Sequence, residues 1–128
     1  MRKVLAETWP RLAGRVDFVE CQLDAVALLS TDIVVSSHAC GRLTDLVLDR
    51  AAAARACVAV LPCCHDLAAC DAGGLTGWVD GPLAIDLMRA VHLEQQAYRV
   101  WTRAIPASIT PKNRLLIGEP RAAGPCDA

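Results

Sequence analysis

Apolar and polar residues alternate along this chain in blocks that predict strands and helices in turn. Two short apolar runs rich in β-branched residues, 32–37 and 57–61, have the length and composition of buried parallel strands. Pro62 ends the second run, because proline cannot donate to a sheet ladder. A further strand is predicted at 16–23, and residues 99–105 with 115–117 predict a final hairpin.

Helical spacing of apolar residues predicts three helices. They cover residues 2–9, 43–56 and 82–98, with Pro82 in a first turn and His92 on the surface. In the middle helix, Thr44 and Asp45 are expected to satisfy free amides of the first turn. The glycine-rich stretch 66–81 predicts a loop long enough to be functional.

This order of elements predicts an α/β fold, a Rossmann-like parallel sheet with helices on both faces and an antiparallel hairpin at the carboxyl end. The 128 residues suffice for one domain, expected over 1–120, with a flexible tail at 121–128. Hydrophobic residues are 54% and charged residues 21%, which excludes a disordered chain. No apolar stretch reaches the roughly 18 residues of a membrane span. Glu7 interrupts any secretory signal, so we expect a cytoplasmic protein without a membrane partner.

Charge is unevenly spread although the net value is only −1. Both ends are basic and the middle is acidic, which excludes a protein that coats DNA. A local phosphate contact in the carboxyl-terminal third stays open, and Lys112, Asn113 and Arg114 in the predicted hairpin turn are its candidates. The alternative is an ordinary solvated turn.

Chemistry-bearing residues follow both predicted buried strands. His38-Ala-Cys-Gly41 comes after the first and Pro62-Cys-Cys-His65 after the second. Ligands of open α/β sheets bind outside the carboxyl ends of the strands, so we expect the two clusters to face one another. His38 and His65 are therefore candidate general bases or substrate positioners, against a purely structural role.

Seven cysteines, an odd number that includes the adjacent pair Cys63-Cys64, predict reduced thiols rather than a disulfide framework. Potential zinc ligands gather near the two strand ends: His38, Cys40, Cys63, Cys64, His65 and Cys70. Adjacent residues of a strand point to opposite faces, however, and the chain has no Cys-x-x-Cys. We therefore predict no metal, with a Cys/His zinc-binding protein as the less favoured alternative.

Four motifs stand in order along the chain: His38-Ala-Cys-Gly41, Thr44-Asp45, Pro62-Cys-Cys-His65, and Ile-Thr-Pro-Lys-Asn-Arg-Leu-Leu-Ile-Gly from Ile109 to Gly118. Together they resemble a branch of the class I S-adenosylmethionine-dependent methyltransferases. The resemblance covers about residues 1–118. It implies S-adenosylmethionine as cofactor, a sheet of strand order 3-2-1-4-5-7-6 that ends in an antiparallel hairpin, and methyl transfer to an unidentified acceptor. A distant branch methylates tRNA 2′-hydroxyl groups, which leaves RNA as an acceptor.

The chain departs from this family at its start. The family's domain begins with a strand, a Gly-rich turn that cradles the cofactor and a second strand ending in an acid that holds the ribose, whereas this sequence opens at the following helix. We therefore expect a truncated fold that lacks the first two strands, is incomplete as an isolated chain and binds the cofactor weakly. Either the 16–23 strand closes up against the 32–37 strand, or a second copy or a complementing segment covers the bare sheet edge.

The resemblance assigns roles to residues of this sequence. It makes His38 or His65 the catalytic base. A weaker part of the resemblance makes Cys63 a nucleophilic thiolate. The cofactor-binding candidates are Gln22, Ser37, Cys40 and Gly41; the substrate-binding candidates are Asp45, Pro62, Cys64, Lys112, Asn113 and Arg114. The alternative from another class is a non-catalytic fragment or interaction module that pairs through the bare sheet edge.

Overall fold

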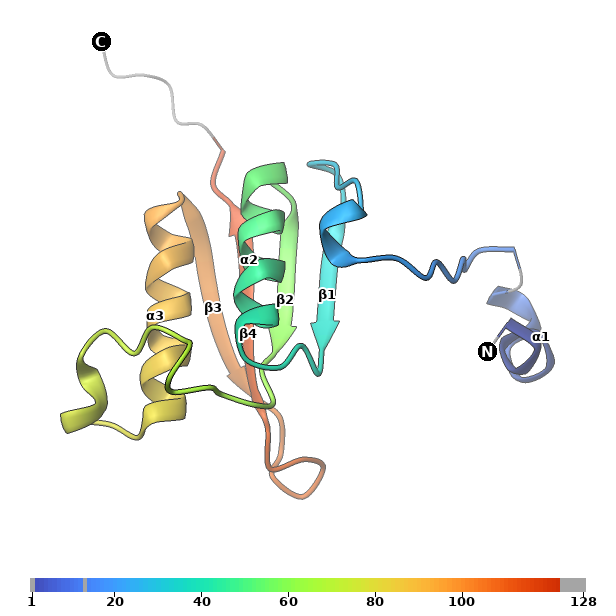
Figure 1. Cartoon of the computed structure of the whole chain (residues 1–128). Coiled ribbons are helices and arrows are strands. Elements are labelled where there is room, and N and C mark those ends of the chain that lie inside the picture. Colours follow the sequence, from blue (N-terminus) through green and yellow to red (C-terminus); the bar gives the residue numbers. More distant parts are fainter. Residues whose placement is uncertain (1, 13, 123–128) are drawn as a thin grey trace, which may run out of the picture.

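A computed structural model describes residues 2–12 and 14–122 (Figure 1). Its helices are α1 (Arg2–Thr8), α2 (Arg42–Ala54) and α3 (Gly81–Gln95), with short 3-10 turns at Pro10–Leu12, Leu23–Ala25 and Leu75–Gly77. Its strands are β1 (Ile33–Ser37), β2 (Cys57–Leu61), β3 (Tyr98–Ala104) and β4 (Arg114–Pro120). The α/β prediction is confirmed.

The four strands form one mixed sheet in the order β1-β2-β4-β3. β1 and β2 are parallel, from Ile33 opposite Cys57 to Ser37 opposite Leu61. β4 runs antiparallel to β2 and to β3, so β3 points in the same direction as β1 and β2. The predicted carboxyl-terminal hairpin is therefore present, with its second strand inserted between β2 and β3.

Both long helices pack on the same face of the sheet (Figure 1), and the prediction of helices on both faces is wrong for the described residues. The reason lies in the strand order. The connections β1-α2-β2 and β2-α3-β3 step across the sheet in the same direction. Right-handed crossovers that step in one direction place their helices on one side.

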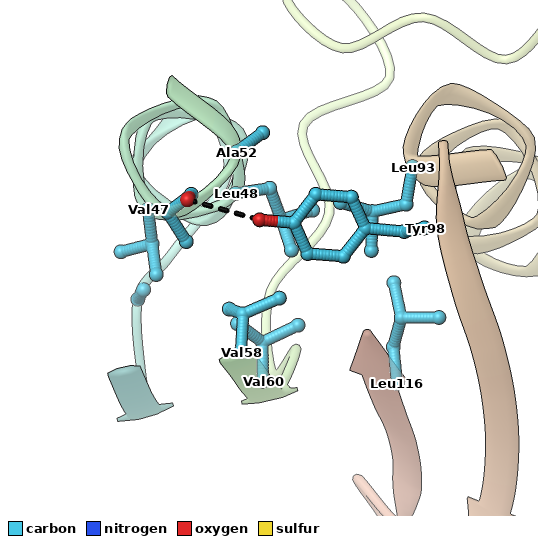
Figure 2. Packing of buried hydrophobic residues seen from close by; sticks show 10 residues of the cluster. Val47, Leu48, Ala52, Val58, Val60, Leu93, Tyr98 and Leu116 are labelled. Atoms are coloured by element: carbon cyan, nitrogen blue, oxygen red, sulfur yellow. Dashed lines mark hydrogen bonds between the residues drawn. The ribbon is translucent and has the colours of Figure 1, made fainter. Parts of the chain in front are cut away.

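Tyr98 lies at the centre of the core between these helices and the sheet (Figure 2). Its ring is fully buried among Leu48, Val58, Leu93 and Leu116. Its hydroxyl points toward α2, within 3.0 Å of the Ala51 carbonyl oxygen and 2.8 Å of that of Ala56. The sequence placed Tyr98 at the end of a helix. The helix instead ends at Gln95, and the turn through Ala97, with φ of 60°, starts β3 at Tyr98.

The predicted strand at 16–23 is wrong. These residues are irregular up to the 3-10 turn at Leu23–Ala25, and β1 has no second strand neighbour within the part of the chain that the structure describes. A strand needs a partner for its backbone groups, and the 16–23 run does not close up against β1. The Arg50 guanidinium donates to the Val26 carbonyl and so ties the end of this segment to α2, whereas α1 lies apart from the sheet (Figure 1).

The end of the described chain is tied to the turn before β3. The Arg121 amide donates to the Ala97 carbonyl at 2.8 Å, and the Arg121 carbonyl accepts from Arg55 at 2.7 Å. Residues 123–128 of the predicted tail lie outside the described residues. None of the described helices is long and apolar enough to cross a membrane.

Replacing Tyr98 by Phe keeps the ring and removes the hydroxyl, which leaves two buried carbonyls without that donor. We expect the Tyr98→Phe chain to lose about 1–3 kcal/mol of unfolding free energy. Urea denaturation measures this loss. Trp78→Phe is the matched control, since Trp78 is 90% exposed and should change stability by less than about 0.5 kcal/mol. Equal losses in both variants would contradict a role for the hydroxyl.

Candidate functional site at the carboxyl ends of β1 and β2

The loops that follow β1 and β2 meet at one edge of the sheet, as the sequence predicts. The strands are parallel, and their last residues, Ser37 and Leu61, are opposite one another. The Gly41 amide donates to the Cys64 carbonyl at 3.0 Å and joins the two loops. Residues that are more than twenty positions apart in sequence are therefore held side by side.

The first loop changes direction through two residues with positive φ. His38 has φ of 64° and Gly41 has φ of 54°, just before α2 begins at Arg42. Such angles favour glycine, so Gly41 fits the entry to the helix, whereas His38 is an exposed side chain in a less favourable conformation. The predicted capping roles of Thr44 and Asp45 are wrong. Gly41 is the N-cap, and no side chain caps the helix.

Three cysteines form a cluster between the loops, which we call the thiol cluster: Cys40, Cys63 and Cys64. The Cys40 and Cys63 sulfurs are 3.5 Å apart, those of Cys63 and Cys64 are 3.7 Å apart, and all three lie within 4.8 Å of one another. The expectation that Cys63 and Cys64 point to opposite faces is wrong. β2 ends at Leu61, so strand alternation no longer applies to them.

Two members of the thiol cluster, Cys40 and Cys64, have pKa values shifted in opposite directions. Hydrogen bonding with Cys64 and Cys63 raises the pKa of Cys40 to about 11. The same contacts with Cys40 and Cys63 lower the pKa of Cys64, and the positive charge of Lys112 lowers it further. Of these two thiols, Cys64 is thus the one that loses its proton more readily.

A buried arginine lies behind this edge. Arg89 of α3 is only 4% exposed, and its guanidinium donates to the Asp45 carboxylate at 2.6 Å, to Asp86 at 3.2 Å and to the Gly41 carbonyl at 2.9 Å. Burial opposes the charge of Arg89, but the Asp45 and Asp86 carboxylates outweigh it and raise the pKa. Asp45, a predicted substrate-binding residue, is therefore an ion-pair partner in this structure. The Thr44 hydroxyl donates to the Ala39 carbonyl.

Asp86 joins this arginine to a histidine. His65 Nε2 lies 2.8 Å from Asp86 Oδ1, and the Arg114 guanidinium donates to Asp86 Oδ2 at 2.7 Å. A neutral His65 donates from Nε2 to the carboxylate, which leaves the lone pair on Nδ1. The side chain of His65 is 3% exposed, and Nδ1 is buried without a hydrogen-bond partner. In a neutral ring, Nδ1 is therefore the nitrogen left to accept a proton.

Two hollows open beside His65. The thiol-side hollow is lined by Cys40, Gly41, Cys64 and His65, together with residues of α2 and the loop after β2. The hairpin-side hollow is lined by Pro62, His65, Lys112 and Arg114, with neighbouring prolines, Asp80 and Asn113. Most of the residues predicted from the sequence thus line one edge.

Other predicted residues have structural roles or lie elsewhere. The Asn113 side chain donates to the Ile105 carbonyl at 2.7 Å and braces the hairpin turn. Ser37 is the exposed last residue of β1. Gln22 is exposed and directly precedes the 3-10 turn Leu23–Ala25. Val26, just after that turn, accepts a hydrogen bond from Arg50, which lies about two helical turns along α2 from the site. No described contact brings Gln22 to the carboxyl edge.

The described residues do not form a complete site for S-adenosylmethionine. The edge offers Cys40 and Gly41, but Gln22 lies away from it and no Gly-rich turn follows a first strand. Within the described chain no strand pairs with the outer side of β1, so the acidic residue that would end such a strand and hold the ribose is missing there. The described residues therefore do not make up such a site by themselves.

Sequence reasoning missed Asp86 and Arg89. A signal was present, because Arg89 stands four residues after Ile85 and four before Leu93, in the stripe of α3 that is buried. A charged residue in an apolar stripe needs a buried partner, and Asp86 lies one turn away. The position of His65 beside Asp86 could not be read from the sequence.

Comparisons of the chain with protein families, with curated proteins and with solved structures find no match.

Replacing Arg89 by Met should leave the Asp45 and Asp86 carboxylates without their shared cation. We expect the Arg89→Met chain to lose about 3 kcal/mol of unfolding free energy, the usual cost of breaking a buried ion pair. Urea denaturation at neutral pH gives the value. The control is Arg114→Met, whose side chain is 42% exposed and which should cost about 1 kcal/mol or less. A small loss for Arg89→Met would show that Asp86 is satisfied without it.

Proposed function

We propose that this chain is the acceptor-side half of a class I S-adenosylmethionine-dependent methyltransferase domain. The observation that carries the proposal is the sheet order, in which the antiparallel strand β4 is inserted between the parallel strands β2 and β3. The family's order 3-2-1-4-5-7-6 ends in this way. β1, β2, β4 and β3 correspond to its strands 4, 5, 7 and 6.

One face of the sheet is uncovered, which supports the proposal that the other half of the domain packs against it. Val35, Ala59, Ile117 and Trp101 form a continuous row across all four strands on the face opposite the core. Val35 is 74% exposed, an unusual position for a valine at the middle of a strand. Strands and helices of a complementing segment, whether part of a longer polypeptide or a separate chain, would cover this face and the outer edge of β1.

His65 is the general base in this proposal. The Asp86 carboxylate fixes the ring and leaves Nδ1 as the proton acceptor, the arrangement by which a carboxylate orients a catalytic histidine. When bound, S-adenosylmethionine supplies an electrophilic methyl group. His65 takes the proton of the acceptor nucleophile at Nδ1 once a rotation of the loop after β2 exposes that buried atom, and the exposed His38 positions the acceptor from the other loop.

An RNA acceptor fits the charges at this edge better than an uncharged acceptor. Lys112 and Arg114 line the hairpin-side hollow next to His65, and cationic side chains hold phosphates. Arg114 already donates to Asp86, so in this proposal Lys112 is the side chain that contacts the phosphate.

The test combines the full chain with a candidate amino-terminal segment, a Gly-rich strand-turn-helix-strand unit. Cross-linking of radiolabelled S-adenosylmethionine and methyl incorporation into total RNA are measured with and without the segment. We expect both signals only when the two parts are mixed. His65→Gln should reduce incorporation by about 100-fold or more while cross-linking persists, which is the usual contribution of a general base.

The control for this variant is His92→Gln, an exposed residue of α3 whose replacement should leave incorporation unchanged. A low-micromolar dissociation constant for the cofactor and the isolated chain, measured by calorimetry, would overturn the half-domain proposal. A stable complex with the segment but no cross-link would favour the non-catalytic interaction module.

The bare face also predicts self-association of the chain when no complementing segment is present. Val35→Lys places a charge in the centre of this face and should shift the chain toward monomer. Light scattering coupled to gel filtration measures the mass. Val19→Lys is the matched control, because Val19 is 76% exposed but outside the sheet. A wild-type chain that is monomeric at high concentration would contradict this prediction.

A further inference from the structure

We propose that the thiol cluster is a zinc-binding site, in which the thiolates of Cys40, Cys63 and Cys64 hold one ion and leave its fourth position open. The inference is independent of methyl transfer. It rests on the convergence of three sulfurs from two loops, including the adjacent Cys63 and Cys64, which the sequence pattern had predicted to point to opposite faces.

The distances between the sulfurs suit a tetrahedral ion. Zinc binds thiolates at about 2.3 Å, which places the sulfurs of two ligands about 3.8 Å apart. The Cys40 to Cys63 and Cys63 to Cys64 separations are 3.5 and 3.7 Å. The remaining pair lies within 4.8 Å, so a small side-chain rotation of the exposed Cys40 or Cys64 completes one face of a tetrahedron.

The backbone that carries the thiols is held by contacts from three sides. β1 and β2 are hydrogen-bonded up to Ser37 and Leu61, and the Gly41 amide donates to the Cys64 carbonyl. The Gly41 carbonyl in turn accepts from the buried Arg89. Ligands fixed in this way lose little freedom when an ion binds, which favours metal binding.

The surroundings match the charge that such a site would carry. Zinc displaces three protons to solvent and forms a centre with three thiolates and a net charge of about −1. Lys112 lies close enough to act on the charge of Cys64 and partly balances this centre. Cys40 and Cys64 line the thiol-side hollow, so the fourth position faces solvent and a water or an incoming ligand atom.

Three converging thiols favour a metal over a disulfide. A disulfide uses two sulfurs and leaves the third without a role, whereas zinc uses all three. No His or carboxylate of the described residues shares the 4.8 Å cluster, so the protein supplies sulfur ligands only. Sulfur ligands select zinc over magnesium or calcium.

The test uses the full chain, reduced and freed of metal, in a Cys21→Ser/Cys126→Ser background. Cys21 is an exposed thiol outside the cluster, and Cys126 lies outside the described residues. Competition with a chromophoric chelator should show one equivalent of bound zinc. Cobalt, as a spectroscopic substitute, should give thiolate charge-transfer bands and the intense visible bands of tetrahedral coordination.

Cys64→Ser is the decisive variant, because Cys64 is exposed and its replacement should not unfold the chain. Loss of a group that merely orients a ligand weakens metal binding by about 10- to 100-fold, so loss of a ligand should weaken it by about 100-fold or more. Cys40→Ser should behave alike. Cys57→Ser, a matched cysteine of β2 outside the cluster, should bind zinc as the background chain does.

Circular dichroism establishes that each variant is folded. Absence of stoichiometric zinc in the folded background chain would overturn the proposal, and so would unchanged affinity in folded Cys64→Ser. A chain that binds no zinc and forms a Cys40–Cys63 disulfide with hydrogen peroxide, detected by mass spectrometry, would also overturn it and assign a redox role instead.

Discussion

The buried guanidinium of Arg89 is the charge on which the carboxyl edge of the sheet depends. It reaches from α3 to the first turn of α2 through Asp45, and to the loop after β1 through the Gly41 carbonyl. Burying such a charge is costly unless it is paired and hydrogen-bonded. The two carboxylates and one carbonyl provide that pairing. They also fix the relative positions of both helices and the first loop.

The same network sets the orientation of His65. Asp86 accepts from Arg89, Arg114 and His65, so one carboxylate balances two permanent cations and orients one ring. The contact between Nε2 and Asp86 leaves Nδ1 as the other ring nitrogen of His65, buried and without a hydrogen-bond partner.

The sequence predicted the central elements well, because their apolar runs are local signals. The run at 57–61 is β2, and the 32–37 and 43–56 patterns match β1 and α2 to within two residues. The 16–23 run failed for a non-local reason. Its β-branched residues favour a strand, but no described strand offers it a partner. The placement of both helices on one face also depended on the strand order, which the sequence alone did not determine.

The candidate site also has one part that the sequence predicted and another that it did not. The meeting of the two loops followed from parallel strands of similar length, and was therefore predictable. The orientation of the side chains was not. Cys63 and Cys64 converge because Pro62 follows the last residue of β2 and releases them from strand alternation. His65 turns toward Asp86 of α3, a partner twenty-one residues away.

Gly41 couples the two parts of this edge. Its amide holds Cys64 and its carbonyl is held by Arg89, so the thiol cluster and the ion network share one peptide segment. We therefore expect a change at Arg89 to alter the relative positions of Cys40 and Cys64, although Arg89 contacts neither sulfur in the described network. Sites that share a backbone segment have non-additive energies. The spacing of the three thiols is thus a property of the whole edge and depends on a charge buried in α3.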